Sequence, residues 1–99
     1  MKNFKNVTTE INKGTDENVD LMKFSHLAET CVSVTPKEGF DLRAMQGRLN
    51  LLGKLNHEAE TIELEDAEAL ILVECAEAMR WNMMHKDLVA FLESVNNLK

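Results

Sequence analysis

Segment 64–81 constrains the chain most, because it is apolar on nearly every side of the helix that it predicts. Two neighbouring lines of apolar residues run along it at helical spacing, one through Ile71 and Cys75 and the other through Leu72 and Ala76. A helix that is apolar around so much of its circumference needs neighbours on more than one side. We therefore predict that residues 66–81 form the central helix of the fold.

Three further segments carry apolar residues at helical spacing and complete the predicted fold class. In each of them an aspartate, Asp20, Asp41 or Asp87, stands where it can cap the backbone donors of the first turn. Gly47, inside the second segment, predicts a close crossing by another element. The expectation is a mainly α fold, a small bundle of four helices over residues 20–34, 41–55, 66–81 and 87–97.

Two short stretches alternate apolar and polar residues as half-buried strands do. Val7 and Ile11 belong to the first stretch, and Ile62 and Leu64 belong to the second. They are the only strand-like stretches in the sequence. We expect a minor two-stranded β element over residues 6–11 and 61–64.

Chain length and composition favour one small domain. The 99 residues are 44% apolar and 28% charged, which is typical of a globular protein. Residues 1–99 are predicted as a single domain, with residues 1–18 partly extended or flexible. No apolar run approaches the length of about 20 residues that spans a bilayer. The basic start is not followed by the apolar segment of a signal peptide, so we expect a cytoplasmic protein. Cys31 and Cys75 stand far apart, which suggests buried, reduced thiols.

The net charge of −6 hides an uneven distribution along the chain. Between Lys54 and Arg80 there is no lysine or arginine, whereas Arg43, Arg48 and Lys54 make the preceding segment mildly basic. A run of carboxylates can meet a basic partner, or it can be a solvated face with some members at a helix start. The acidic surface predicted on the first interpretation consists of Glu58, Glu60, Glu63, Glu65 and Glu68.

Motifs for chemistry are incomplete. His57 and Glu58 begin like the zinc-protease motif, but Thr61 stands where the second histidine ligand is needed. His26, His57 and His85 are scattered along the chain, and the four glycines never form a phosphate-binding loop. The net charge and the few aromatic residues disfavour nucleic-acid binding. We predict no enzymatic activity, no metal and no cofactor.

Trp81 is the only tryptophan, and two methionines follow it closely. A tryptophan at a helix end beside adaptable methionines is typical of an interface anchor. The predicted interface consists of Trp81, Met83, Met84 and Phe91. The alternative is that Trp81 covers the core where the last two helices meet.

The segments Gly39–Leu49, Ile62–Asp66 and Met79–Trp81 resemble, with the residues between them, small uncharacterised accessory proteins encoded by tailed phages and prophages. The resemblance extends over about residues 36–99 and includes no motif with chemical content. It implies a phage accessory protein that acts by binding, in the host cytoplasm or in the virion.

Three functions remain open on the sequence. The first is a non-enzymatic protein–protein interaction module that self-associates through its central and last helices. The second is an acidic inhibitor that occupies the basic nucleic-acid-binding surface of a host protein. The third is a dimeric regulator that touches DNA through residues 42–54.

Overall fold

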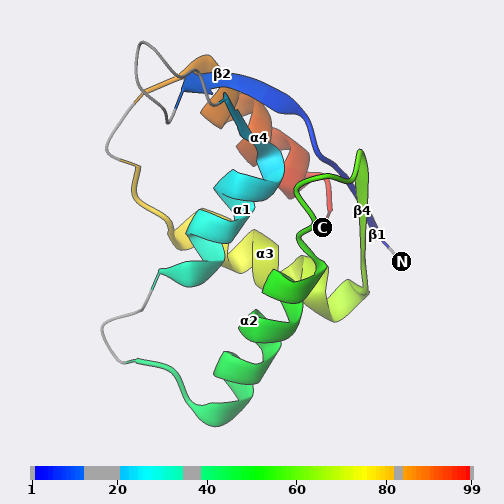
Figure 1. Ribbon diagram of the computed structural model, residues 1–99. Coiled ribbons are helices and arrows are strands. Elements are labelled where there is room, and N and C mark those ends of the chain that lie inside the picture. The colour runs from blue at the N-terminus through cyan, green and yellow to red at the C-terminus, as the bar shows by residue number, and fades with distance from the viewer. Residues whose placement is uncertain (1, 13–20, 35–38, 82–83, 99) are drawn as a thin grey trace.

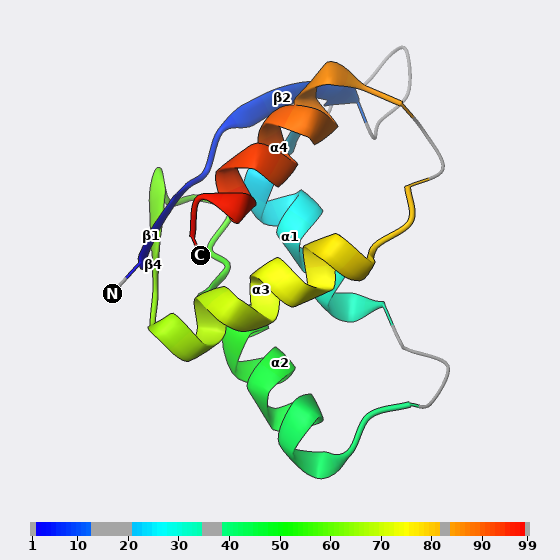
Figure 2. The same ribbon diagram turned by 180° about the vertical axis from the view of Figure 1, so that it is seen from behind.

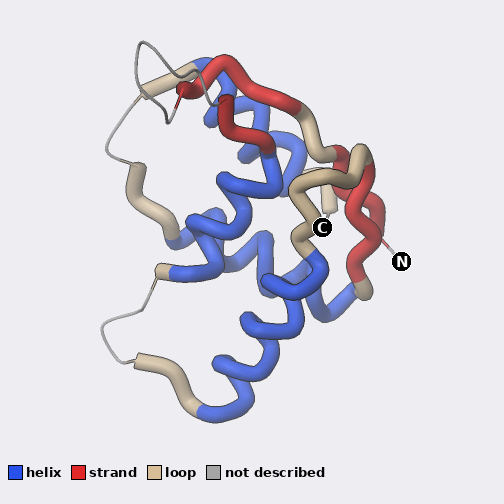
Figure 3. Tube along the Cα trace, in the orientation of Figure 1, coloured by secondary structure: helices blue, strands red, loops and turns tan. Residues whose placement is uncertain are grey.

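The computed structural model describes residues 2–12, 21–34, 39–81 and 84–98. Within these residues the chain forms three short strands, two helices, a fourth strand and two further helices (Figures 1 and 3). The elements in chain order are β1 (Lys2–Lys5), β2 (Thr8–Asn12), β3 (Leu21–Lys23), α1 (Phe24–Ser33), α2 (Leu42–Lys54), β4 (Thr61–Leu64), α3 (Asp66–Ala78) and α4 (Lys86–Asn96).

The predicted four-helix bundle is wrong, because the described residues form an α+β arrangement of four helices and two small antiparallel sheets. α3 lies in the middle and contacts each of the other helices. In Figures 1 and 2, α2 extends to one side of α3, and α4 and β2 lie on the other side. The helices do not pack as a bundle, because strands supply part of their packing: α4 packs on β1 and β2 as well as on α3, and α2 packs on β4.

The predicted strand pairing is corrected as well. β4 forms as expected over residues 61–64, but it pairs with β1, so that buried Phe4 lies opposite buried Ile62. The predicted strand 6–11 is interrupted at residues 6 and 7, and its second part, β2, pairs with β3. Asn6 explains the interruption, because its side-chain Nδ2 donates to the carbonyls of His57 and Ala59 and bridges two segments.

Two predicted helices are too long. The first begins at Phe24 and not at residue 20, because residues 21–23 pair with β2 as strand β3. The central helix ends at Ala78, and Met79 is already extended, with φ −68° and ψ 135°. Helices α2 and α4 match their predictions to within one residue at each end.

Helix starts are capped partly as predicted. Asp20 lies outside the described residues, and the residue at the N-cap of α1 is Lys23. The Asp41 carboxylate accepts the Ala44 backbone N–H at 2.7 Å and caps α2. At α4 the cap is His85, whose Nδ1 accepts the Asp87 N–H, and the Asp87 carboxylate instead accepts the Glu10 N–H of β2. This bond ties the start of α4 to the strand beside it.

One core joins elements from both ends of the chain. Phe4, Phe24 and Phe91 pack with ring centroids 5.5–6.2 Å apart and link β1, α1 and α4. Leu72 of α3 is fully buried in the same cluster. Gly47 lets α2 approach α3, because a Cβ at this position would lie 3.1 Å from Ile71 Cδ1. The predicted close crossing at Gly47 is therefore present.

Candidate functional site

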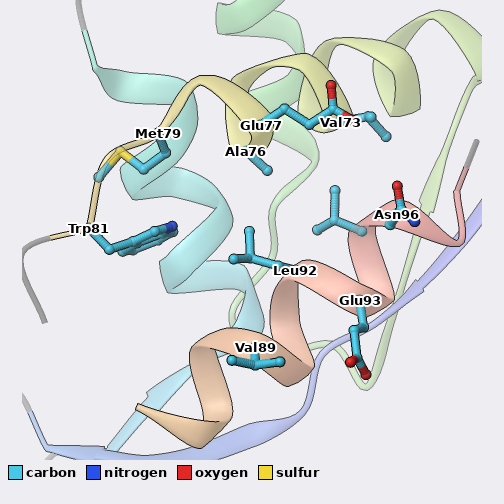
Figure 4. Close-up of a pocket in the computed structure, with 10 residues that line it drawn as sticks. Val73, Ala76, Glu77, Met79, Trp81, Val89, Leu92, Glu93 and Asn96 are labelled. Carbon is cyan, nitrogen blue, oxygen red and sulfur yellow. The ribbon is translucent and has the colours of Figure 1, made fainter. Parts of the chain in front are cut away.

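A pocket lies between α3 and α4 on the side where Trp81 follows α3 (Figure 4). Its volume is about 420 Å³. Apolar side chains make most of its wall, and the polar side chains of Glu77, Glu93 and Asn96 also line it. This volume is within the range of about 300–1,000 Å³ that ligand pockets commonly have.

Trp81 lines this pocket and carries an unpaired polar atom. The indole Nε1 is buried and has no hydrogen-bond partner among the residues that the structure describes. The ring packs edge-to-face on Phe91, with centroids 6.4 Å apart. A buried N–H without an acceptor costs free energy, and such groups are rare in native structures. Trp81 is the strongest candidate for a functional residue.

The predicted interface residues do not share one surface. Phe91 has no exposed area and belongs to the core, so no partner can reach it. Met84 is 99% exposed, whereas Trp81 is half-buried against the core, as its alternative interpretation expected. Met83 lies outside the described residues. The fold therefore brings together Trp81 and Phe91, but as packing partners.

The predicted acidic surface is smaller than its five residues suggested. Glu58, Glu60, Glu63 and Glu65 are exposed. Glu68 is buried, and its carboxylate accepts the Glu65 backbone N–H at 2.9 Å and the Lys54 ammonium at 3.3 Å. The side chain of Glu65 accepts in return from the backbone of Glu68, which completes a capping box at the start of α3.

Two of the three basic residues of 43–54 are engaged within the chain, whereas Arg43 is exposed. Lys54 pairs with Glu68, and the Arg48 guanidinium donates to the backbone carbonyls of Val32 and Val34 at 3.0 and 2.9 Å. The same guanidinium lies 4.7 Å from the centre of the Phe40 ring. Arg48 thus fixes α2 to the end of α1 and is not presented to an external phosphate.

A hydrogen-bonded chain of Ser25, His57 and Glu29 was not expected from the sequence. Ser25 Oγ lies 2.7 Å from His57 Nδ1, and His57 Nε2 lies 2.8 Å from Glu29 Oε2. His26 stacks on His57 with ring centroids 4.0 Å apart. Only the spacing of Ser25, His26 and Glu29 along one helix was visible beforehand, because His57 comes from a distant connector.

The three hydrogen-bonded side chains resemble the nucleophile, base and acid of a catalytic triad, but Ser25 is fully buried. A nucleophilic serine must reach its substrate, with donors placed to stabilise the oxyanion. The Ser25 backbone N–H is already bonded to Asn6 Oδ1, at 2.9 Å. Lys23 Nζ donates to the His57 carbonyl at 2.8 Å. These hydrogen bonds therefore hold α1 against the connector that precedes β4, and their role is structural.

Two cysteines line one small cavity where α1, α2 and α3 meet. Cys31, Cys75 and Arg48 contribute to its wall. Both cysteines are free and buried. Burial, with a smaller contribution from Cys75, raises the pKa of the Cys31 thiol from 9.0 to about 12. Burial also raises the pKa of Cys75, against the opposing influence of Arg48. Both groups are therefore neutral thiols at neutral pH and weak nucleophiles.

An exposed apolar stripe follows α2. Leu42, Met45 and Leu49 are 71%, 44% and 60% exposed, although they share one face at helical spacing. Leu51 is the buried residue of this helix. Exposed apolar side chains are common singly, but a row of three on one helix face is a candidate contact surface.

No group of three metal-ligating side chains gathers within the described part of the chain. None of the described helices is long and apolar enough to cross a membrane. Comparison of the chain with known protein families, with curated proteins and with solved structures found no match.

Proposed function

We propose that this chain is a non-enzymatic interaction protein that self-associates through the stripe on α2 made by Leu42, Met45 and Leu49. The observation that carries the proposal is the exposure of all three side chains on one face of a 13-residue helix. This proposal keeps the self-association expected from the sequence. It moves the contact from the region of Trp81 and Phe91 to α2.

The spacing of the stripe suits a second copy of the same helix. Leu42, Met45, Leu49 and Leu52 occupy the a and d positions of two heptads, which is the pattern of helices that pair along a seam. Leu52, near the end of α2, is half-buried against the core. The apolar seam therefore runs from the core at Leu52 to the exposed start of the helix at Leu42. In Figures 1 and 2, the start of α2 lies away from α4 and the sheets, whereas its end lies near β4. Two copies can therefore approach each other along α2, and a two-fold contact uses the same stripe twice.

The contact is expected to be weak. Stable interfaces bury ~1,200 Å² or more in total. Even a large aromatic side chain buries only ~150–250 Å², so three partly exposed aliphatic side chains from each copy fall well short of that area. We expect a dimer that forms at high protein concentration and dissociates on dilution.

Sedimentation velocity over a range of protein concentrations tests the proposal. The wild-type sedimentation coefficient should rise with concentration, and Leu49→Asp should keep it at the monomer value, because a charge in the seam is desolvated by pairing. Leu70→Asp is the matched control, since Leu70 is 57% exposed on α3, outside the stripe. Circular dichroism confirms that each variant is folded.

Three results would contradict this assignment. The wild-type chain could stay monomeric at every concentration, or Leu70→Asp could abolish association as fully as Leu49→Asp does. Association that survives Leu49→Asp but is lost in Met84→Asp would return the interface to the region of Trp81.

The proposed setting is a cytoplasm. Free, buried Cys31 and Cys75 suit a reducing compartment. A phage accessory role stays a prediction that rests on the sequence resemblance alone.

A further inference from the structure

The pocket between α3 and α4 has a feature that self-association through α2 does not use. It combines a mostly apolar wall with the buried, unpaired N–H of Trp81. We propose that it binds a small, largely apolar molecule that has no negative charge and carries one hydrogen-bond acceptor, such as a ketone oxygen.

The pocket opens to solvent. Val89 on its wall is 55% exposed, and the Glu77, Glu93 and Asn96 side chains are exposed too. The deeper wall is formed by Val73, Ala76 and Val95, all of which are buried. A molecule that enters from the polar rim therefore reaches an apolar interior, which is the usual arrangement of a ligand site.

The Trp81 N–H selects for an acceptor. Figure 4 shows the indole nitrogen on the edge of the ring that is turned towards Leu92. Trp81 follows α3 on a segment that is not helical, so a modest rotation of the ring can present the N–H to a ligand. An acceptor that takes this hydrogen bond satisfies a donor that no described residue satisfies.

The charges at the rim select against anions. Glu77 and Glu93 both line the pocket, and its lining holds no lysine or arginine from the described part of the chain. An anionic ligand would lose hydration and meet two carboxylates of the same sign. An uncharged ligand avoids this repulsion and is the occupant that the lining favours.

Trp81 also provides the measurement, because it is the only tryptophan and gives a single indole N–H signal in a ¹H–¹⁵N NMR spectrum. Camphor, a rigid neutral ketone, serves as the probe, and camphor-10-sulfonate serves as its matched anion. Camphor should shift the indole signal in a saturable way at millimolar concentration. The sulfonate should leave it in place.

Two variants separate the two sources of selectivity. Trp81→Phe keeps the aromatic wall and removes the N–H, and it should weaken camphor binding about threefold to tenfold, the net value of one hydrogen bond. Binding to this variant is followed by the shifts of the Val73 and Leu92 methyl signals. Glu93→Gln should improve binding of the sulfonate by a larger factor than binding of camphor.

Each arm has a result that overturns the proposal. These results are an indole signal that camphor and related neutral ketones never move, sulfonate binding equal to camphor binding, unchanged camphor affinity in Trp81→Phe, and sulfonate binding that Glu93→Gln does not improve. The Leu49→Asp variant should bind camphor as the wild type does. This control makes the outcome independent of the proposed dimer.

Discussion

Helices α2 and α4 have similar sequence patterns and opposite surroundings. Both are amphipathic, with 13 and 11 residues. In α4 the apolar residues Leu88, Phe91 and Val95 are all buried, whereas in α2 the apolar residues Leu42 and Leu49 are mostly exposed. The comparison shows that periodicity reveals an apolar face but not whether the fold covers it.

The difference arises from the neighbours of each helix. α4 packs on α3 and is also held by β1 and β2. The Asp87 carboxylate accepts the Glu10 N–H of β2, and Lys86 Nζ lies 2.9 Å from Glu10 Oε2. α2 contacts α1, α3 and β4, and these contacts cover the side of Leu51 but not the stripe. The uncovered face is the reason for proposing a contact there.

The largest expected effect is a loss of stability, and it tests directly whether α4 is covered and α2 is exposed. Phe91→Ala should lower the free energy of unfolding by ~3–5 kcal/mol, because it leaves a cavity among packed rings. Leu49→Ala should change it by less than ~0.5 kcal/mol, since most of the side chain is already in water. Urea denaturation at a concentration where the chain is monomeric measures both values. Equal losses would show that the stripe is covered in solution.

An intermediate effect concerns the cavity where α2 joins α1 and α3. The Cys31 thiol has a pKa of about 12 in the folded chain against an ordinary value of 9.0. The folded state therefore keeps a proton that the unfolded state releases. Stability from this group is complete below pH 9 and is lost as pH rises towards 12, by ~1.4 kcal/mol per pH unit for one proton.

Urea midpoints measured as a function of alkaline pH check this expectation. The midpoint should fall less steeply in Cys31→Ala than in the wild type, because lysines and other groups titrate equally in both chains. Identical slopes would mean that Cys31 has the same pKa in the folded and unfolded states.

The smallest expected effect is a gain in stability from replacing the glycines of α2, and it tests how closely α2 packs on α3. Gly53→Ala should stabilise the chain by up to ~1 kcal/mol, because alanine favours a helix and nothing lies within 4 Å of the new Cβ. Gly47→Ala should gain less, since its Cβ would lie 3.1 Å from Ile71 Cδ1. In an Ile71→Val background, which lacks that methyl group, Gly47→Ala should recover the gain.

Thermal denaturation of these variants measures the three effects. Equal stabilisation by Gly47→Ala and Gly53→Ala in the wild-type background would show a looser approach of α2 to α3.

Local patterns were sufficient for much of the secondary structure. The ends of α2 and α4, the Asp41 cap, strand β4 and the crossing at Gly47 could all be predicted. The first turn of the predicted helix 20–34 was wrong, because pairing with β2 decides the conformation of residues 21–23. The bundle was wrong for the same reason, since a two-stranded contact depends on distant partners.

The candidate site could also be predicted only in part. Trp81 could be singled out from its type and position, but its unpaired N–H depends on the surroundings that α3 and α4 create. The contact between His26 and His57 joins two distant segments and had no signal in the sequence. Glu68 was assigned to an acidic surface because its role as a buried cap requires the geometry of Glu65 and Lys54.

The sequence by itself determined that four helices form, which segments hold them and which of their faces are apolar, because helical spacing is set by residues within a few positions of one another. Only the tertiary structure decided that α4 is covered, that α2 is left open and that Trp81 faces a pocket. These outcomes depend on which segments, far apart in the sequence, pack on the same apolar surface. Such packing cannot be inferred from the pattern of neighbouring residues.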